Sequence, residues 1–243
     1  MVRRHIYLHG LLALLFLLTL ACGSIGLPEL LGGPTATPPP PTATPEGNVL
    51  EYNVAPYEVT LAAGENVPGT QIYFNGESNG AFQLSLDGLP VEKFAVDSLT
   101  WAGIIAPGVT GDYRMRLVPA LNSRLTVAGL VDVTILDPAP VEVGNSVNLS
   151  GPIRFNNIPQ TYSIELNQTL PGTTVFYAGK TTDGALLGGT IQTSPYRKEG
   201  DALVWTGQLR ANVMVRYDLR VVNFTDNRLN LVGTADLAIT PAQ

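Results

Sequence analysis

The sequence is short of the side chains that most often carry out catalysis or bind transition metals. It has a single cysteine, Cys22, and its only two histidines, His5 and His9, stand close to its start. Histidine is the most frequent general base, and imidazole and thiolate are the ligands that zinc and copper prefer. We therefore predict that the chain is not an enzyme and has no catalytic residues, no cofactor and no metal site.

Positive charge is also scarce. Charged residues make up 14% of the chain, acidic residues outnumber basic ones by 20 to 14, and no run of lysine or arginine occurs. A nucleic-acid-binding surface needs a basic patch that neutralises phosphates, so nucleic acid is not an expected partner. Two segments, Asn75–Asn79 and Asn223–Asn227, have oxygen-bearing side chains suited to calcium. Neither has the spacing of a calcium-binding loop, and we interpret both as turns.

The start of the chain is apolar. Arg3 and Arg4 precede the run Ile6–Ala21, which is followed at once by Cys22. The run is shorter than the roughly 20 residues that a membrane-spanning helix needs, and it fits the apolar region of a secretory signal peptide. With small Ala21 directly before the cysteine, the pattern resembles the lipobox of bacterial lipoproteins.

This resemblance implies that the thiol of Cys22 receives a diacylglyceryl group and that residues 1–21 are removed as a signal peptide. Two or three acyl chains hold a protein stably at a membrane. The expected location is the bacterial cell envelope, on its extracytoplasmic face, with the membrane as a partner through the lipid on Cys22. Two alternatives stay open: an uncleaved N-terminal anchor helix, and an ordinary signal peptide followed by a coincidental cysteine.

The segment after Cys22 is of low complexity. Residues 32–47 read GGPTATPPPPTATPEG, with no hydrophobic side chain larger than alanine. Such a segment cannot bury a core, and its prolines favour an extended polyproline II form. We predict that residues 22–47 are a disordered, lipid-anchored, Pro/Thr-rich linker that holds the rest of the chain away from the membrane.

The remaining chain contains an internal repeat. PGTQIYFNG, which starts at Pro68, matches PGTTVFYAG, which starts at Pro171. Further matches follow in the same order: DSLTWAG from Asp97 with DALVWTG from Asp201, Tyr113 with Tyr217, Arg116 with Arg220, Gly129 with Gly233, and Asp132 with Asp236. Two copies of this size fit ordinary domains better than a solenoid, which needs several shorter repeats. We place the boundary near Pro138, which gives domains at 48–138 and 139–243.

Each copy has the pattern of β-strands. Apolar residues alternate with polar ones in Leu125–Ile135, Val213–Val221 and Leu229–Ile239. A period of two places one face of a strand on a core and the other toward solvent, and the Gly, Asn and Asp clusters between such runs are typical of turns. No long window has helical periodicity. The sequence therefore predicts an all-β fold.

Two further features suggest the kind of β fold. Each copy has one tryptophan, Trp101 or Trp205, which we expect at the centre of a core, with a sugar-stacking role as the alternative. The strands around Tyr113 and Tyr217 resemble the Gly-x-Tyr-x-Leu-x-Val strand of bacterial immunoglobulin-like domains, and Gly111 supplies the glycine in the first copy. The resemblance implies two tandem immunoglobulin-like β-sandwich domains.

The acidic residues that recur in both copies are expected to be structural, because a catalytic site is seldom needed twice. They are Asp97 with Asp201 and Asp132 with Asp236. Asp97 and Asp201 each precede a predicted strand, so we expect their carboxylates to bond backbone amides in turns.

These features predict a non-enzymatic, membrane-anchored cell-surface lipoprotein that presents its β-sandwich domains for protein binding or as part of the envelope structure. Its expected partner is another envelope protein or a glycan. The alternative is a pair of carbohydrate-binding modules that use exposed aromatic side chains. One of Tyr73 and Phe74, and one of Phe176 and Tyr177, is expected to face solvent and to be able to contact a ligand. Exposed coplanar rings would favour the sugar.

Overall fold

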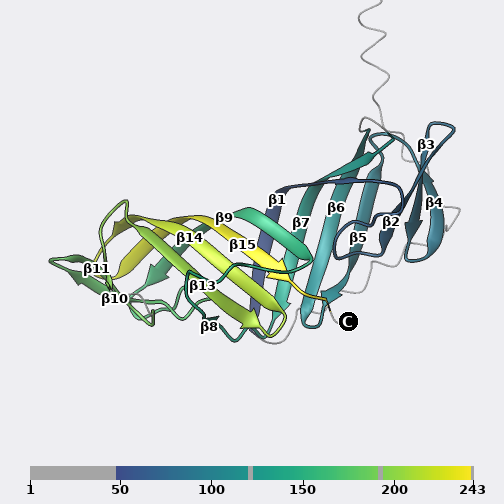
Figure 1. Cartoon of the computed structure of the whole chain (residues 1–243). Helices are drawn as coiled ribbons and strands as arrows, with labels where there is room; N and C mark the ends of the chain where they lie inside the picture. Colours follow the sequence, from purple (N-terminus) through teal and green to yellow (C-terminus); the bar gives the residue numbers. More distant parts are fainter. Residues whose placement is uncertain (1–47, 120–122, 191–193, 242–243) are drawn as a thin grey trace, which may run out of the picture. The chain divides into compact units, whose positions relative to one another are not determined.

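The structure is a computed structural model that describes residues 48–119, 123–190 and 194–241. The described residues consist of strands, turns and loops, which confirms the predicted all-β fold (Figure 1). None of them belongs to a helix long and apolar enough to cross a membrane. The predicted signal peptide, Cys22 and the predicted linker lie outside the described residues.

The N-terminal half, residues 49–136, contains two antiparallel sheets. The larger has the strand order β1-β7-β6-β5, and the smaller has the order β2-β3-β4. The strands are β1 (Val49–Leu61), β2 (Ile72–Ser78), β3 (Ala81–Leu86), β4 (Leu89–Lys93), β5 (Ser98–Ala106), β6 (Val109–Pro119) and β7 (Leu125–Leu136). The chain thus leaves the larger sheet after β1, builds the smaller sheet, and returns to pair β7 with β1.

The C-terminal half, residues 141–239, has the same order of strands with one strand added. Its larger sheet reads β9-β15-β14-β13-β8, and its smaller sheet reads β10-β11-β12. The strands are β8 (Val141–Glu142), β9 (Ile153–Glu165), β10 (Phe176–Thr181), β11 (Gly184–Gly188), β12 (Tyr196–Arg197), β13 (Ala202–Arg210), β14 (Val213–Phe224) and β15 (Arg228–Ile239). The added strand is β8, on the outer side of β13.

The alternation of apolar and polar residues has its expected result in the larger sheets. Five residues of β7 are fully buried: Leu125, Val127, Val131, Val133 and Ile135. The residues between them are partly or fully exposed. Ile72, Phe74 and Leu84 of the smaller sheet belong to the same core. Two sheets that share a core in this way are consistent with a β-sandwich.

The strand order differs from that of an immunoglobulin constant-type domain. That fold places its first, second, fourth and fifth strands in one sheet. Here the first strand pairs with the seventh, and the second, third and fourth form a sheet of their own. The immunoglobulin-like assignment is therefore not confirmed. The strands that suggested it, β6 and β14, lie inside the larger sheets with Tyr113 and Tyr217 fully buried.

The repeated Trp-x-Gly segment has a packing reason. In both halves the indole lies over the glycine two residues later, leaving no room for a side chain there. A Cβ on Gly103 would be 2.6 Å from the ring of Trp101, and a Cβ on Gly207 would be 2.0 Å from the ring of Trp205. Trp205 is fully buried, and Trp101 is partly buried against the core.

The two halves pack against each other through reciprocal contacts. Gly69, in the first PGT turn, lies against Ile153 at the start of β9, and Gly172, in the second, lies against Leu50 near the start of β1. Both glycines have positive φ, 83° and 73°, and neither has space for a Cβ. Glycine is therefore required at both positions for two reasons, its backbone conformation and the lack of space for a side chain. The described residues form one compact unit with a single continuous core. Whether each half is a domain by itself stays a prediction.

Candidate functional site

The four aromatic residues considered for ligand contact lie in different environments. Phe74 and Tyr177 are fully buried, so their rings belong to the core and are closed to a ligand from solvent. Phe176 is partly buried, with its ring over Gly188, where a Cβ would approach to 2.2 Å. Tyr73 is 40% exposed. Ligand contact therefore remains open for Tyr73 and, in part, for Phe176, and these four residues do not form a pair of exposed rings.

Tyr73 borders a shallow groove of about 320 Å³ beside the end of β5. The apolar wall of the groove includes Ile104, whose exposed fraction of 74% is high for a large hydrophobic residue, together with Pro152 and Ile153 from the C-terminal half. The side-chain nitrogen of Asn66 donates to two backbone carbonyls of its own turn at 3.2 and 3.1 Å. The groove therefore suits an apolar group more than a charged one.

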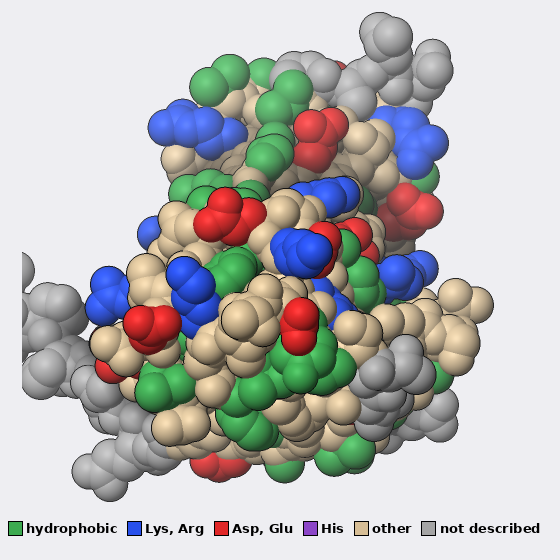
Figure 2. Space-filling view, turned by 90° about the vertical axis from the view of Figure 1, so that its left-hand side faces the viewer, with side chains coloured by type: hydrophobic (Ala, Val, Ile, Leu, Met, Phe, Trp, Pro, Cys, Tyr) green, Lys and Arg blue, Asp and Glu red, His purple; other side chains and the backbone are tan. Residues whose placement is uncertain are grey.

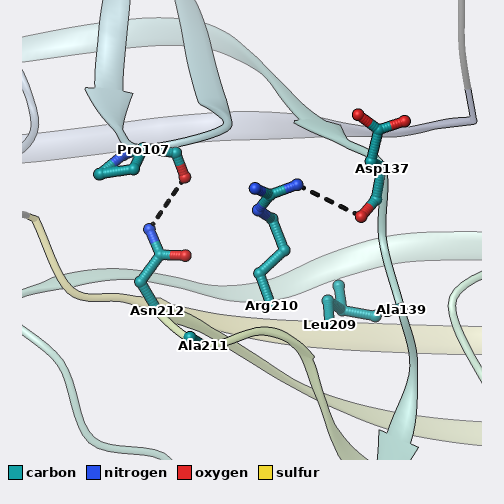
Figure 3. A pocket seen from close by; sticks show the side chains of 7 residues that line it. All are labelled: Pro107, Asp137, Ala139, Leu209, Arg210, Ala211 and Asn212. Atoms are coloured by element: carbon teal, nitrogen blue, oxygen red, sulfur yellow. Dashed lines mark hydrogen bonds between the residues drawn. The ribbon is translucent and has the colours of Figure 1, made fainter.

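A larger hollow of about 630 Å³ lies where the β5–β6 and β13–β14 turns meet (Figure 3). Its polar side chains join the two halves. Nη1 of Arg210 donates to the backbone carbonyls of Leu136 and Asp137, the latter at 3.2 Å. Nδ2 of Asn212 donates to the carbonyl of Pro107 at 3.2 Å. We interpret this hollow as a by-product of the junction.

Two tyrosine hydroxyls meet where the halves pack together. Tyr52 on β1 and Tyr217 on β14 are buried, and their hydroxyl oxygens are 2.5 Å apart. Tyr217 also donates to the carbonyl of Pro171 at 3.2 Å, so a chain of hydrogen bonds runs from Tyr52 through Tyr217 to that carbonyl. Burial raises the pKa of both hydroxyls far above their ordinary value, so both remain protonated at neutral pH. Their role is to join the halves.

The recurring aspartates that precede strands have structural partners. A carboxylate oxygen of Asp97 accepts the N–H of Phe94 at 2.8 Å, and that of Asp201 accepts the N–H of Lys198 at 2.7 Å. These bonds confirm the predicted place of both aspartates in turns. Within the described ranges, no three His, Cys, Asp or Glu side chains gather closely enough to hold a metal ion.

An uncovered sheet edge is the feature that sequence reasoning missed. β5 is the outermost strand of its sheet, and no described residue pairs with its outer side. It reads SLTWAGIIA, without the charged residues or proline that usually protect an edge strand from unwanted pairing. Thr100, Ala102 and Ile104 on this strand are exposed. The absence of charge over a whole strand was a signal in the sequence, but nothing there marked this strand as an edge.

Charge does not single out another site on the face drawn in Figure 2. Lysine, arginine, aspartate and glutamate side chains are interspersed there, with small groups of hydrophobic side chains between them. A mixed surface has little long-range field to attract a polyanion or a polycation. On this face, recognition would depend on shape and hydrogen bonding more than on net charge.

Comparison with known proteins adds no relative. No protein-family model, no curated protein and no solved structure matches the chain. We therefore infer function from the chain's own residues and geometry.

Proposed function

We propose that this chain is a non-enzymatic lipoprotein of the bacterial cell envelope, anchored through Cys22 on the extracytoplasmic side. Its two halves, related by duplication, present a rigid β surface that binds another protein or forms part of the envelope structure. The linker at 22–47 connects that surface to the membrane. The sequence before residue 48 supports the location, and the packing of the two halves supports the role.

The observation that carries the role is the use of the repeated residues. The PGT glycines Gly69 and Gly172 contact the opposite half, Tyr217 bonds Tyr52 across the junction, and Asp97 bonds its own turn. Residues that recur because they pack or terminate turns are those of a scaffold, whereas a catalytic site would bring reactive groups together in a cleft. The scaffold role is therefore favoured over catalysis.

The anchor is tested by replacing one residue. We expect Cys22→Ser to abolish labelling of the protein by a radioactive fatty acid and to leave an unprocessed precursor, because only the thiol can accept the diacylglyceryl group. Ala21→Gly is the matched control, since glycine is also small and leaves the cysteine in place. Normal processing of Cys22→Ser would contradict the lipoprotein assignment.

The binding role is tested with the full chain as bait in envelope extracts, with a glycan array run beside it. We expect a specific protein partner and no glycan signal. The carbohydrate alternative has weaker support, because Tyr73 is exposed while Phe176 is only partly exposed and Phe74 and Tyr177 are fully buried. A glycan signal that Tyr73→Ala removes would favour the alternative.

A further inference from the structure

We propose that the outer edge of β5 is a docking site for an extended segment of a partner protein, which adds to the larger sheet as an antiparallel strand. The proposal rests on the proposed function, of which it names the binding edge and the form of the partner. It comes from a comparison of the two halves, because the chain itself covers the equivalent edge in one half and leaves it open in the other.

The counterpart of β5 in the C-terminal half is β13. Ala102 of β5 pairs with Asp112 of β6, and Thr206 of β13 pairs with Arg216 of β14, at matching places in the repeat. The outer side of β13 is occupied by β8, which pairs antiparallel with it. Figure 1 shows β8 beside β13, while the order β1-β7-β6-β5 ends at β5.

The covering segment is longer than β8 itself. The N–H of Ala139 donates to the carbonyl of Leu209 at 2.8 Å, and the N–H of Val143 donates to the carbonyl of Thr206 at 2.9 Å. The side chain of Thr206 then meets that of Asn145, with 3.2 Å between their oxygens. The segment Ala139–Val143 therefore runs along β13, with every second residue in place to bond its backbone, and a turn that starts at Gly144 brings the side chain of Asn145 to Thr206.

The same backbone groups are open on β5. The carbonyl of Thr206 points to the covering segment, and since the register of the two halves matches, the N–H and carbonyl of Ala102 point away from β6. In a strand the bonding direction alternates, so Thr100 and Ile104 present their groups on the same side. Among the described residues nothing bonds to this side of β5.

Burial reflects this difference. Thr206 and Trp205 are fully buried, whereas Ala102 is exposed and Trp101 is partly exposed. An unpaired, uncharged edge that the same fold covers elsewhere is a template for strand addition, in which backbone bonds supply affinity and side-chain pockets supply selectivity.

The chain's own sequence indicates that the covering strand comes from elsewhere. Val143, whose N–H bonds β13, stands ten residues before the start of β9, and the residue that stands ten before the start of β1 is Pro39. Proline has no N–H and cannot donate to a ladder. A linker with proline at that place lacks the N–H needed to repeat the bond that Val143 donates to the carbonyl of Thr206.

The surroundings of the edge describe the partner. The groove bordered by Tyr73, Ile104 and Pro152 lies at the end of β5, where it can take an apolar side chain of the incoming segment. Thr100, Ala102 and Ile104 carry no charge. The partner segment is therefore extended, free of proline at its bonding positions, and has an aliphatic or aromatic residue near the groove.

The test uses a fluorescently labelled nine-residue peptide, PAPVEVGNS, which copies residues 138–146, and the full chain in a neutral detergent. We expect saturable binding by fluorescence anisotropy, with slower amide hydrogen exchange at Thr100, Ala102 and Ile104. Ala102→Pro removes one outward N–H at an edge position, where proline is tolerated, and should weaken binding by about tenfold. The matched control Ala102→Val keeps the N–H and should bind as the wild type does.

A second measurement avoids any doubt about folding of the protein variant. The same peptide carrying Val143→Pro lacks one donor and should bind the wild-type chain about tenfold more weakly. No saturable binding, or equal binding by Ala102→Pro, would overturn the proposal. If the wild-type chain forms a dimer that Ala102→Pro dissociates, the edge belongs to a second copy of the chain. If the β5 amides are protected in a monomer without peptide, the edge is covered by residues 1–47. Either result overturns the proposal of a partner segment. None of these results affects acyl labelling at Cys22, so the lipoprotein assignment is judged separately.

Discussion

The hydrogen bonds that join the halves lead to an asymmetric prediction for two conservative substitutions. Tyr52→Phe and Tyr217→Phe each delete one hydroxyl from the pair whose oxygens are 2.5 Å apart. Tyr52 has this one hydroxyl contact, while Tyr217 also donates to the carbonyl of Pro171. Although both rings are buried and both changes remove the same atom, we expect the second change to cost more.

The magnitudes follow from what each change leaves behind. Tyr52→Phe removes one bond, and Tyr217 keeps its donation to Pro171, so the free energy of unfolding should fall by about 1 kcal/mol. Tyr217→Phe leaves the hydroxyl of Tyr52, on a side chain 1% exposed, without its partner and also frees the Pro171 carbonyl. The loss should then be about 2–4 kcal/mol. The double variant should lose less than Tyr217→Phe alone, because no buried donor is stranded.

Urea unfolding followed by tryptophan fluorescence measures these differences. Trp205 is a suitable reporter, because it is fully buried and its ring centre lies 6.2 Å from that of Tyr217. The decisive quantity is the order of the midpoints at constant slope. If Tyr52→Phe proves as costly as Tyr217→Phe, or if the double variant is less stable than both, the hydrogen-bond chain proposed across the junction is wrong.

Three further predictions concern stability. The hydroxyl of Tyr57 is buried with no hydrogen-bond partner among the described residues, so Tyr57→Phe should leave the free energy of unfolding unchanged or raise it by about 1 kcal/mol. Tyr162→Phe loses the 2.6 Å bond to Gln160 and should lower the free energy of unfolding by a similar amount. Equal effects of the two changes in urea unfolding would contradict this. Val96 has a φ of 72°, a strained conformation for valine, at the place where the C-terminal half has Gly200. Val96→Gly should therefore raise the free energy of unfolding by about 1 kcal/mol and raise the melting midpoint, whereas Gly200→Val should lower both. Burial raises the pKa of the Tyr52, Tyr57 and Tyr217 hydroxyls above their ordinary value of 10.0, so above about pH 10 the folded chain keeps protons that the unfolded chain loses. The free energy of unfolding should therefore fall above about pH 10, by about 1.4 kcal/mol per pH unit for each of these tyrosines. A free energy of unfolding that stays constant from about pH 9 to pH 11 would refute this.

Much of the fold was predictable because burial leaves a local pattern. The alternation in Leu125–Ile135 and Val213–Val221 marks two strands, and both are strands in the structure. The order of the strands was not predictable in the same way. The pairing of β1 with β7 joins residues far apart in the chain, and no local pattern records which distant strand a sheet edge accepts. The strand motif at Tyr113 therefore suggested an immunoglobulin-like fold, which the order of the sheets does not confirm.

The candidate site was predictable only in part, for a related reason. A strand read alone shows that adjacent aromatics such as Tyr73 and Phe74 face opposite ways, but not which of them faces the core. Phe74 pairs with Leu84 of β3, and both lie on the face of the smaller sheet that packs into the core. The open edge of β5 depends on the absence of a neighbouring strand, which is a property of the assembled sheet and not of the strand's own residues.

The closing of each larger sheet by its last strand has a consequence for how the chain acquires its structure. Leu50 of β1 pairs with Ile135 of β7, and Ile153 of β9 pairs with Ile239 of β15. In each half, the strand that is synthesised first therefore has no sheet partner until the last strand of that half has been made. Such high contact order slows folding and prolongs the exposure of apolar strands. A chain that ends before β15 would leave β9 without its partner and the core shared by the halves open. Completion of the fold of the described residues thus depends on β15.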